Sequence, residues 1–381
     1  MRRGLVPLIA LTVSVLAVAP AIASSAKRAD RKLDRALHEL VELDGGPPGV
    51  AAIVDRGGKA RLHRAGVGTV PSARPFRRND HMRIASVAKA FNGAVALTLV
   101  DRGVMSLDGT IGELLPNLPA AWSEVTLEQA LHHTGGLPDY IKDPEFIKDF
   151  TSNLRQYFSP EQLVGYVADE PLRFTPGTQY EYSDTDNIVV GLMAQAASGS
   201  SYEALLRRLV YKRLGLRQTS LPDGFLMPRP FIHGYGLEPG QPPENVSQLL
   251  SASGAWASGG IVSTPSDLNR FIRGYTGGRL FGGDARSAQF QFFPGGESQP
   301  PGPGENSAGL GIFRYETDCG TVFGASGSIP GYMHIAAAKR NGRRSMTVSI
   351  NTQFDFDSEV FQRLRRIYNL AACAARAGPG Q

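Results

Sequence analysis

Segments with the alternating pattern of β-strands lie at both ends of the 381-residue chain. Two of them, residues 50–55 and 59–67, are joined near the N-terminal end by a short Arg-Gly-Gly turn. Four more lie beyond residue 308, namely 309–317, 321–325, 332–338 and 345–351. Because helical periodicity fills most of the chain between the two groups, we expect strands from both ends to pair in one antiparallel sheet.

Helical patterns flank these strands at residues 30–43, 86–102 and 358–374, and Gly, Pro and Ser dominate a predicted surface loop at 282–307. The sequence therefore predicts a mixed α/β (α+β) fold, in which helices flank an antiparallel sheet and an all-helical segment is inserted. The expected layout is a discontinuous sheet domain at 24–110 and 251–375, a mostly helical insertion at 111–250 and a disordered tail at 376–381.

The first 23 residues have the pattern of a cleaved export signal. Arg2 and Arg3 form a basic start, residues 5–19 are almost uniformly apolar, and Ala-Ile-Ala at 21–23 offers a cleavage site. No later stretch is long and apolar enough to span a bilayer, so we expect a secreted protein, free or associated with the cell wall, without a membrane span after cleavage.

Charge and composition exclude several classes of function. The net charge of +5 falls by two, to +3, when Arg2 and Arg3 leave with the signal, and the basic residues are scattered along the chain. This pattern does not indicate a nucleic-acid-binding protein. Adjacent His132 and His133 diverge on a regular element, so they do not indicate a metal site, and we expect no cofactor and a monomer.

The chain holds two cysteines, Cys319 and Cys373. In an oxidising compartment an isolated pair of this kind favours a single disulfide. Closing so long a loop is expected to stabilise the fold by roughly 3–4 kcal/mol.

The pattern S-x-x-K occurs at Ser86 and Lys89, where a long apolar helix is predicted to begin. Residues i and i+3 share one face of a helix, so the lysine amine can reach the serine hydroxyl and accept its proton. The N–H at the helix start is also placed to stabilise a developing oxyanion. Ser24 and Lys27 satisfy the same pattern at the signal cleavage site, where no such context exists.

Two further segments support chemistry at Ser86. Tyr182 lies in the stretch GTQYEYSDTDNIVVG, where a phenol can carry a proton between Ser86 and a leaving group if Lys89 lowers its pKa. The second segment is GASGSIPGY at 324–332, whose small residues let a substrate backbone lie along a sheet edge. There the N–H of Ser328 is a candidate second oxyanion donor.

With these three motifs in order, the chain resembles the serine β-lactamase and penicillin-binding protein superfamily in its class C and D,D-peptidase branch. The segments LHHTGGLPDY at 131–140 and SGGIVSTPSDLNRF at 258–271 also resemble segments of that family. The nearest resemblance is to exported D-alanyl-D-alanine carboxypeptidases of actinomycete type. It implies Ser86 as the acylated nucleophile, Lys89 as its base and Tyr182 as the proton shuttle, with Ser326, Gly327 and Ser328 beside the substrate.

Two residues depart from the family pattern. Ala325 stands where the family has Lys or His, and Asp184 stands where it has Asn. A methyl group cannot attract a substrate carboxylate, whereas Asp184 can either repel such a group or pair with Lys89. Arg314, close to the third motif, is a candidate to supply the missing positive charge, and Trp256 is a candidate for the wall of the cleft.

The resemblance implies a D-alanyl-D-alanine carboxypeptidase that acts on peptidoglycan stem peptides and reacts with penicillins and other β-lactams at Ser86. A β-lactamase, an esterase of the same fold and a non-catalytic wall-peptide-binding protein are the alternatives. The esterase tolerates Ala325 best because it needs no anchor for a carboxylate.

Overall fold

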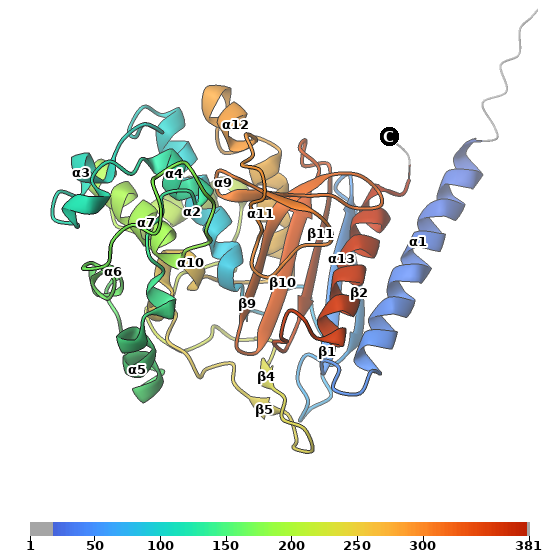
Figure 1. Cartoon of the computed structure of the whole chain (residues 1–381). Helices are drawn as coiled ribbons and strands as arrows, with labels where there is room; N and C mark the ends of the chain where they lie inside the picture. Colours follow the sequence, from blue (N-terminus) through green and yellow to red (C-terminus); the bar gives the residue numbers. More distant parts are fainter. Residues whose placement is uncertain (1–17, 379–381) are drawn as a thin grey trace, which may run out of the picture.

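The central sheet of the computed structural model, which describes residues 18–378, has seven antiparallel strands in the order β2-β1-β11-β10-β9-β8-β7 (Figure 1). The strands are β1 Gly49–Arg56, β2 Ala60–Gly66, β7 Asn306–Gly309, β8 Ile312–Tyr315, β9 Val322–Ile329, β10 Tyr332–Ala338 and β11 Arg344–Ile350. Strand β1 pairs with β11, so strands from the two ends of the chain meet in one sheet, as the sequence predicts.

Alternation along the strands divides the buried side chains between two cores. Val50, Ala52 and Val54 of β1 contact one core, whereas Ala51 between them contacts the other. Successive side chains of a strand point to opposite faces, and both faces of this sheet are covered by helices. Each Val or Leu buried in this way stabilises the fold by about 1.5–3 kcal/mol.

Helices α1 Val18–Val41 and α13 Glu359–Arg376 pack together on one face of the sheet (Figure 1). Leu33, Leu37 and Leu40 of α1 are fully buried there, which confirms the predicted helix. Helix α1 begins earlier than expected and runs through the predicted cleavage site. The rest of the predicted signal, residues 1–17, and the end of the predicted tail, 379–381, lie outside the described residues.

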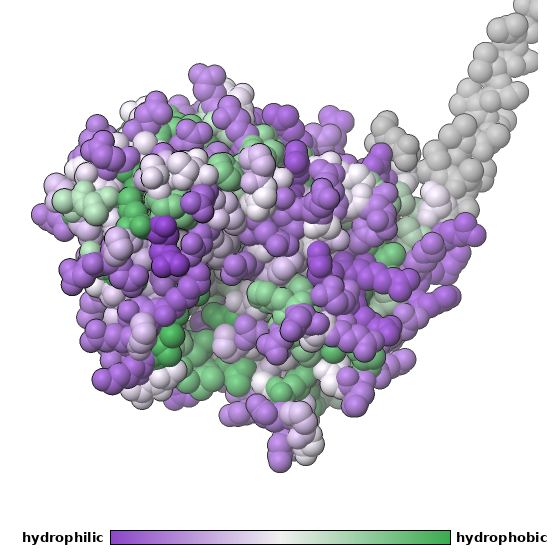
Figure 2. Space-filling model, in the orientation of Figure 1, coloured by the Kyte–Doolittle hydropathy of each residue, from purple (hydrophilic) through white to green (hydrophobic). Residues whose placement is uncertain are grey.

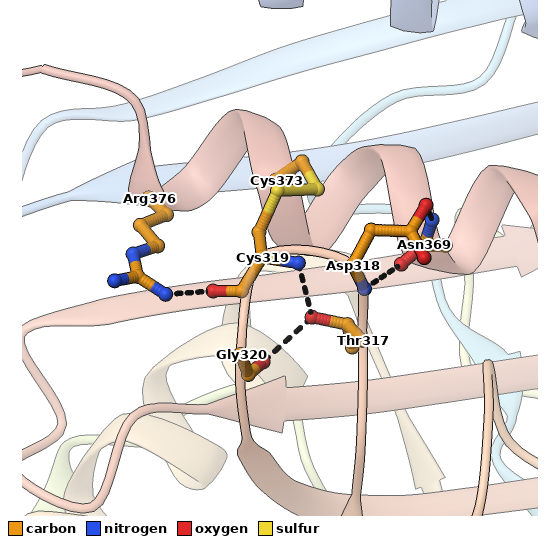
Figure 3. Close-up of a disulfide and its surroundings, with 7 residues drawn as sticks. All are labelled: Thr317, Asp318, Cys319, Gly320, Asn369, Cys373 and Arg376. Atoms are coloured by element: carbon orange, nitrogen blue, oxygen red, sulfur yellow. Dashed lines mark hydrogen bonds between the residues drawn. A yellow bond between two sulfur atoms is a disulfide. The ribbon is translucent and has the colours of Figure 1, made fainter.

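A disulfide joins Cys319, in the turn between β8 and β9, to Cys373 of α13 (Figure 3). The two Cα atoms are 5.2 Å apart. Three hydrogen bonds tie the same turn to the helix: the N–H of Asp318 donates to Asn369 Oδ1, Asn369 Nδ2 donates to Asp318 Oδ2, and Arg376 donates to the carbonyl of Cys319 (Figure 3). The predicted disulfide is therefore confirmed, and it fastens α13 to the sheet.

Helix α11 Pro265–Thr276 covers the opposite face, with α2 Ala88–Asp101 against β8 and β9, and α10 Trp256–Gly259 and α12 Gly283–Gln289 pack on α2. The helices between residues 111 and 214 pack beyond α2 (Figure 1). They are α3 Ile111–Leu114, α4 Leu127–His132, α5 Pro144–Ser152, α6 Pro160–Gly165, α7 Asp184–Ser198, α8 Tyr202–Leu205, the π-helical η4 Leu206–Tyr211 and α9 Lys212–Leu214. Thr110, Thr126 and Ser159 each begin one of them with a reciprocal capping box.

Two expectations about local structure need correction. The predicted loop 282–307 contains helix α12 and reaches the first residues of β7. The predicted helical insertion also holds a small hairpin, β4 Tyr235–Gly236 with β5 Glu244–Asn245, within a long irregular stretch. Among the described residues, no helix is long and apolar enough to cross a membrane.

Candidate active site

Ser86 lies in a tight 3₁₀ turn, η1 Ala85–Val87, directly before α2. The short strand β3 Met82–Arg83, paired with β6 Val262–Ser263, leads into this turn. Ala85 has a φ of +49°, in the left-handed region, which costs a residue with a Cβ about 1–2 kcal/mol. Strain of this kind directly before a candidate nucleophile is typical of functional sites.

Strand β9 holds the strained turn in place. An ideal Cβ at Gly327 would lie 2.5 Å from the carbonyl oxygen of Ile84 and 2.9 Å from the nitrogen of Ser86, so this position needs glycine. From β10, His334 Nε2 lies 2.7 Å from the carbonyl oxygen of Arg83. Pairing with β8 covers only residues 322–324 of β9, which leaves the segment around Gly327 free to pack against Ser86.

Lys89 is buried one helical turn after Ser86. Its Nζ lies 3.2 Å from Ser86 Oγ, 2.7 Å from Asp184 Oδ1 and 3.1 Å from the carbonyl oxygen of Ser258. A charged lysine amine has three N–H donors, and three acceptors surround this one. The geometry is therefore that of a charged amine at rest, which must lose a proton before it can act as a base.

Tyr182 completes the group around Ser86. Lys89 Nζ lies 4.9 Å from the centre of its ring. Burial raises the pKa of Tyr182 well above its ordinary value and the charge of Asp184 adds to this, while a hydrogen bond with Ser86 acts in the opposite direction. The expected lowering of the Tyr182 pKa by Lys89 is therefore not found, and the resting side chain is a neutral phenol.

His133 and Asp186 position the Tyr182 ring from behind. The His133 ring stacks on it with centroids 4.6 Å apart, and His133 Nδ1 lies 2.8 Å from Asp186 Oδ2. Burial lowers the pKa of His133 to about 3 and raises that of Asp186 well above its ordinary range. His133 is therefore neutral near pH 7, and the burial of Asp186 favours its neutral form.

Asp139 supports Asp184 at the first residue of α7. The backbone N–H of Asp184 donates to Asp139 Oδ1 at 3.0 Å. Burial, together with the negative charge of Asp184, raises the pKa of Asp139 to about 7. This carboxyl therefore titrates near neutral pH, directly beside the Lys89–Asp184 ion pair.

Replacing Asp139 by Asn is expected to change how stability depends on pH. The folded pKa of about 7 lies above the unfolded value of about 4, so the folded state holds an extra proton between these values. The contribution of Asp139 is complete below about pH 4 and is lost as the pH rises through 7. The free energy of unfolding in urea is measured at pH 5 and pH 8 for both proteins. The stability of Asp139→Asn relative to the wild type should be greater at pH 8 than at pH 5. The exposed control Asp169→Asn should follow the wild type, and an unchanged pH slope in Asp139→Asn would contradict the assignment.

A cleft of about 380 Å³ opens over Ser86, Tyr182 and Asp184. Large hydrophobic side chains form much of its wall: Tyr140, Ile141, Phe146, Ile147, Phe150, Leu250 and Phe356. Figure 2 shows hydrophobic surface gathered around the hollow between the helices and the sheet. Asp184 is the one charged residue that lines the cleft within the described chain, and no Lys, Arg or His joins it there.

Six of the residues singled out from the sequence lie together. Ser86, Lys89, Tyr182 and Asp184 are connected by the contacts given above, Gly327 packs on the Ser86 turn, and Ser328 lines the cleft. Of the two alternatives for Asp184, pairing with Lys89 is the one the structure shows. Ser328 Oγ accepts a hydrogen bond from Gln353 Nε2 at 2.9 Å.

Three other predicted residues lie outside the cleft. Arg314 donates to Ser307 on the neighbouring strand and lies over the ring of Phe292. Trp256 turns toward Glu203, to which its indole N–H donates at 3.2 Å. The Ser326 hydroxyl is buried and donates to the carbonyl of Pro300. Arg314, Trp256 and Ser326 are therefore not among the residues that line the cleft.

Sequence reasoning missed His133, Asp139, Gln299 and Gln353. His133 and Asp139 are the first and last residues of HTGGLPD, within the segment 131–140 that carries the family resemblance, but the resemblance assigns no role to either side chain. Gln299 comes from the predicted loop and Gln353 from the chain after β11, and both line the cleft. No local pattern marks either glutamine, because tertiary folding alone brings them to Ser86.

Comparison with known proteins agrees with this geometry. The family model described as Beta-lactamase matches residues 31–368. Penicillin-binding protein 4* of Bacillus subtilis is 25% identical over 221 residues, which cover 55% of this chain and 48% of that protein. Esterase EstB of Burkholderia gladioli is 31% identical over 223 residues, covering 54% and 55%. The chain thus spans about half the length of these curated relatives.

Solved structures match over a larger share of the chain. A D-stereospecific amidohydrolase from Streptomyces sp. has 27% identity and a TM-score of 0.76, with 87% of this chain and 97% of that one covered. D-amino acid amidase from Ochrobactrum anthropi SV3 has a TM-score of 0.80 at 22% identity, with 92% and 99% covered, which bears on the fold alone. The fold class expected from the sequence is confirmed. The chain belongs to the Beta-lactamase family, within the superfamily of serine β-lactamases and penicillin-binding proteins.

Proposed function

We propose that the protein is a serine hydrolase that cleaves uncharged esters or amides through an acyl-enzyme on Ser86. One observation carries this proposal: the cleft over Ser86 has apolar walls, and the charged residue among its described lining is Asp184, an anion. An apolar acyl group gains free energy on entering such a cleft, whereas a carboxylate next to the scissile bond finds no cation among the described lining residues, and Asp184 already pairs with Lys89.

The residues around Ser86 can carry out both halves of the reaction. Lys89 Nζ first passes one proton to the carboxylate of Asp184, and Ser86 Oγ then attacks the carbonyl carbon while its own proton passes to the neutral amine. The N–H groups of Ser86 and Ser328 stabilise the oxyanion. The leaving oxygen or nitrogen then takes a proton by way of Tyr182, and water releases the acyl group by the reverse sequence.

Two relatives support uncharged substrates. The Burkholderia gladioli relative is named as an esterase, and the Streptomyces structure is of a D-stereospecific amidohydrolase. An ester or a primary amide presents no carboxylate at the leaving group. Ala325 stands where the family has a cation, and it is buried in the core. Substrates without a carboxylate do not need that cation, so its absence does not weaken their binding.

The D-alanyl-D-alanine carboxypeptidase expected from the sequence is the second candidate. A specific observation favours it: Gln299, Gln353 and Ser328 line the cleft, and their neutral N–H and O–H groups can bind a peptide end. The relatives named as penicillin-binding proteins agree with it. Its difficulty is the absence of a cation among the described lining residues.

A pair of peptides distinguishes the two candidates. Diacetyl-L-Lys-D-Ala-D-Ala and the same peptide with a C-terminal amide differ in one negative charge. We expect kcat/KM to favour the amide by about tenfold or more, because the free acid must be desolvated in a cleft whose described lining holds no cation to pair with it. p-Nitrophenyl butyrate should be hydrolysed faster than either peptide.

Asp184→Asn should narrow the difference between the two peptides, and Ser86→Ala sets the background rate. A clear preference of the wild type for the free acid would overturn the ester and amide proposal and favour the carboxypeptidase.

We also propose that the protein is exported. The basic and apolar start of the chain supports this, as does the disulfide, because such bonds persist mainly in oxidising compartments. N-terminal sequencing of protein from the culture medium should begin near Ser24, whereas recovery of the intact N-terminus from the cytoplasm would contradict export.

A further inference from the structure

A second large cavity lies at the opposite end of the sheet from the cleft. Its volume is about 950 Å³, and it lies where the turns β1–β2 and β10–β11 meet the last residues of α11 and α13. Strand β10 runs from the cleft end to this end, and its seven residues span roughly 20 Å. We call this cavity the basic basin.

Arginine and lysine dominate the basic basin. Eight of its ten lining residues are cationic, and the other two are Gly57 and Asn341. No carboxylate is among these ten. Arg273 pairs with Asp55 at 2.6 Å and Arg56 pairs with Asp30, and both carboxylates lie outside the lining. The basin therefore keeps a strong excess of positive charge.

Two of the other cations, Arg286 and Lys339, donate to carbonyl groups, which carry no formal charge, although Glu316 lies close enough to act on Lys339. Arg286 donates to the carbonyls of Thr276 and Arg340, and Lys339 donates to that of Thr321. Burial lowers the pKa of Lys339 and of Arg286, and neighbouring Arg376 and Arg340 lower them further. Cations that disfavour one another in this way are stabilised when an anion enters between them.

The chemistry of the lining narrows the kind of anion. Guanidinium groups bind phosphate oxygens in pairs, which favours phosphate. No aromatic ring lines the basin, so bases of a nucleic acid would find nothing on which to stack. The cations also line a concavity without exposed apolar side chains, a shape that a flat membrane surface cannot enter.

We propose that the basic basin is a binding site for a linear phosphodiester polymer without bases, of the poly(glycerol phosphate) type. Its volume exceeds what one phosphate needs, so consecutive phosphates of one chain can enter it together. Because the cleft lies at the other end of the sheet, a bound polymer leaves Ser86 accessible. The site would hold the enzyme on an anionic polymer while Ser86 acts on small substrates.

Charge reversal of two exposed arginines tests the proposal. Arg340→Glu with Arg343→Glu changes the basin, and Arg207→Glu with Arg208→Glu makes the same change of net charge on exposed residues of η4. Binding of fluorescent poly(glycerol phosphate) is followed by anisotropy from 0.05 M to 0.3 M NaCl. The basin variant should bind about tenfold or more weakly, with a shallower salt dependence, whereas the η4 variant should stay close to the wild type.

Three results would overturn the proposal. The first is an equal loss of polymer binding in both double variants. The second is binding of phosphatidylglycerol vesicles or single-stranded DNA in preference to the polymer. The third is competition by inorganic phosphate that is as strong as competition by unlabelled polymer at equal phosphate concentration. Hydrolysis of p-nitrophenyl butyrate should be unchanged in both double variants. This activity shows that they fold, and it separates failure of the basin from failure of the proposed hydrolase.

Discussion

Replacing Lys89 by Met is expected to lower kcat/KM for p-nitrophenyl butyrate by roughly 10³-fold. Methionine has a similar length but no amine, so Ser86 loses the group 3.2 Å away that can receive its proton. The same change leaves Asp184 buried without its ion-pair partner, which should destabilise the fold by about 3 kcal/mol or more.

The double variant Lys89→Met with Asp184→Asn separates these two effects. It removes both charges, so most of the lost stability should return while activity stays low. The exposed control Lys148→Met should resemble the wild type in both respects. Full activity in the double variant would exclude Lys89 as the base.

Removing the disulfide is expected to have the largest effect on stability. Cys319→Ser with Cys373→Ser opens a loop with a sequence separation of 54 residues, which should cost about 4 kcal/mol on the chain-entropy model. Urea unfolding of the double variant measures this loss. Activity at 25 °C should be nearly unchanged, because the bond fastens α13 to the sheet on the face away from α2 and Ser86.

Reduction of the wild type provides the matched comparison. Dithiothreitol should shift its unfolding midpoint to that of the double variant and should leave the double variant itself unchanged. If the unfolding midpoint of the wild type does not change although the disulfide has been reduced, the disulfide contributes little to the stability of the fold.

The strands at both ends of the chain could be predicted, but the predicted strand 309–317 is the two strands β7 and β8, and β9 runs to Ile329 beyond its predicted end at 325. Strand β10 begins and ends at the predicted residues 332 and 338, and β11 differs by one residue at each end. Helix α12 was missed because Gly and Ser in 282–307 indicate a loop, although Ala285 and Ala288 are buried. The composition of this segment favours a loop, whereas the stability of so short a helix comes from tertiary packing, which the local sequence does not show.

The centre of the site could also be predicted, since Ser86 and Lys89 are three residues apart and motifs mark Tyr182 and Gly327. Its periphery could not. The φ of +49° at Ala85 has no signature in the sequence, because Ala rarely adopts it. Trp256 has a φ of +31° and points away from the cleft, and Arg314 lies on the face of β8 toward Phe292. The directions in which the side chains of Trp256 and Arg314 point depend on backbone angles and strand register, which the sequence pattern does not specify.

The measurement that tests the central claim most directly is the site of covalent labelling. A p-nitrophenyl alkylphosphonate transfers its phosphonyl group to an activated serine, releases p-nitrophenol and leaves a stable adduct. Intact-mass and peptide-mass spectrometry should find one adduct on Ser86 of the wild type and none on Ser86→Ala, with ester hydrolysis lost in parallel. Labelling of another residue, or hydrolysis that persists in Ser86→Ala, would contradict the assignment of Ser86 as the nucleophile.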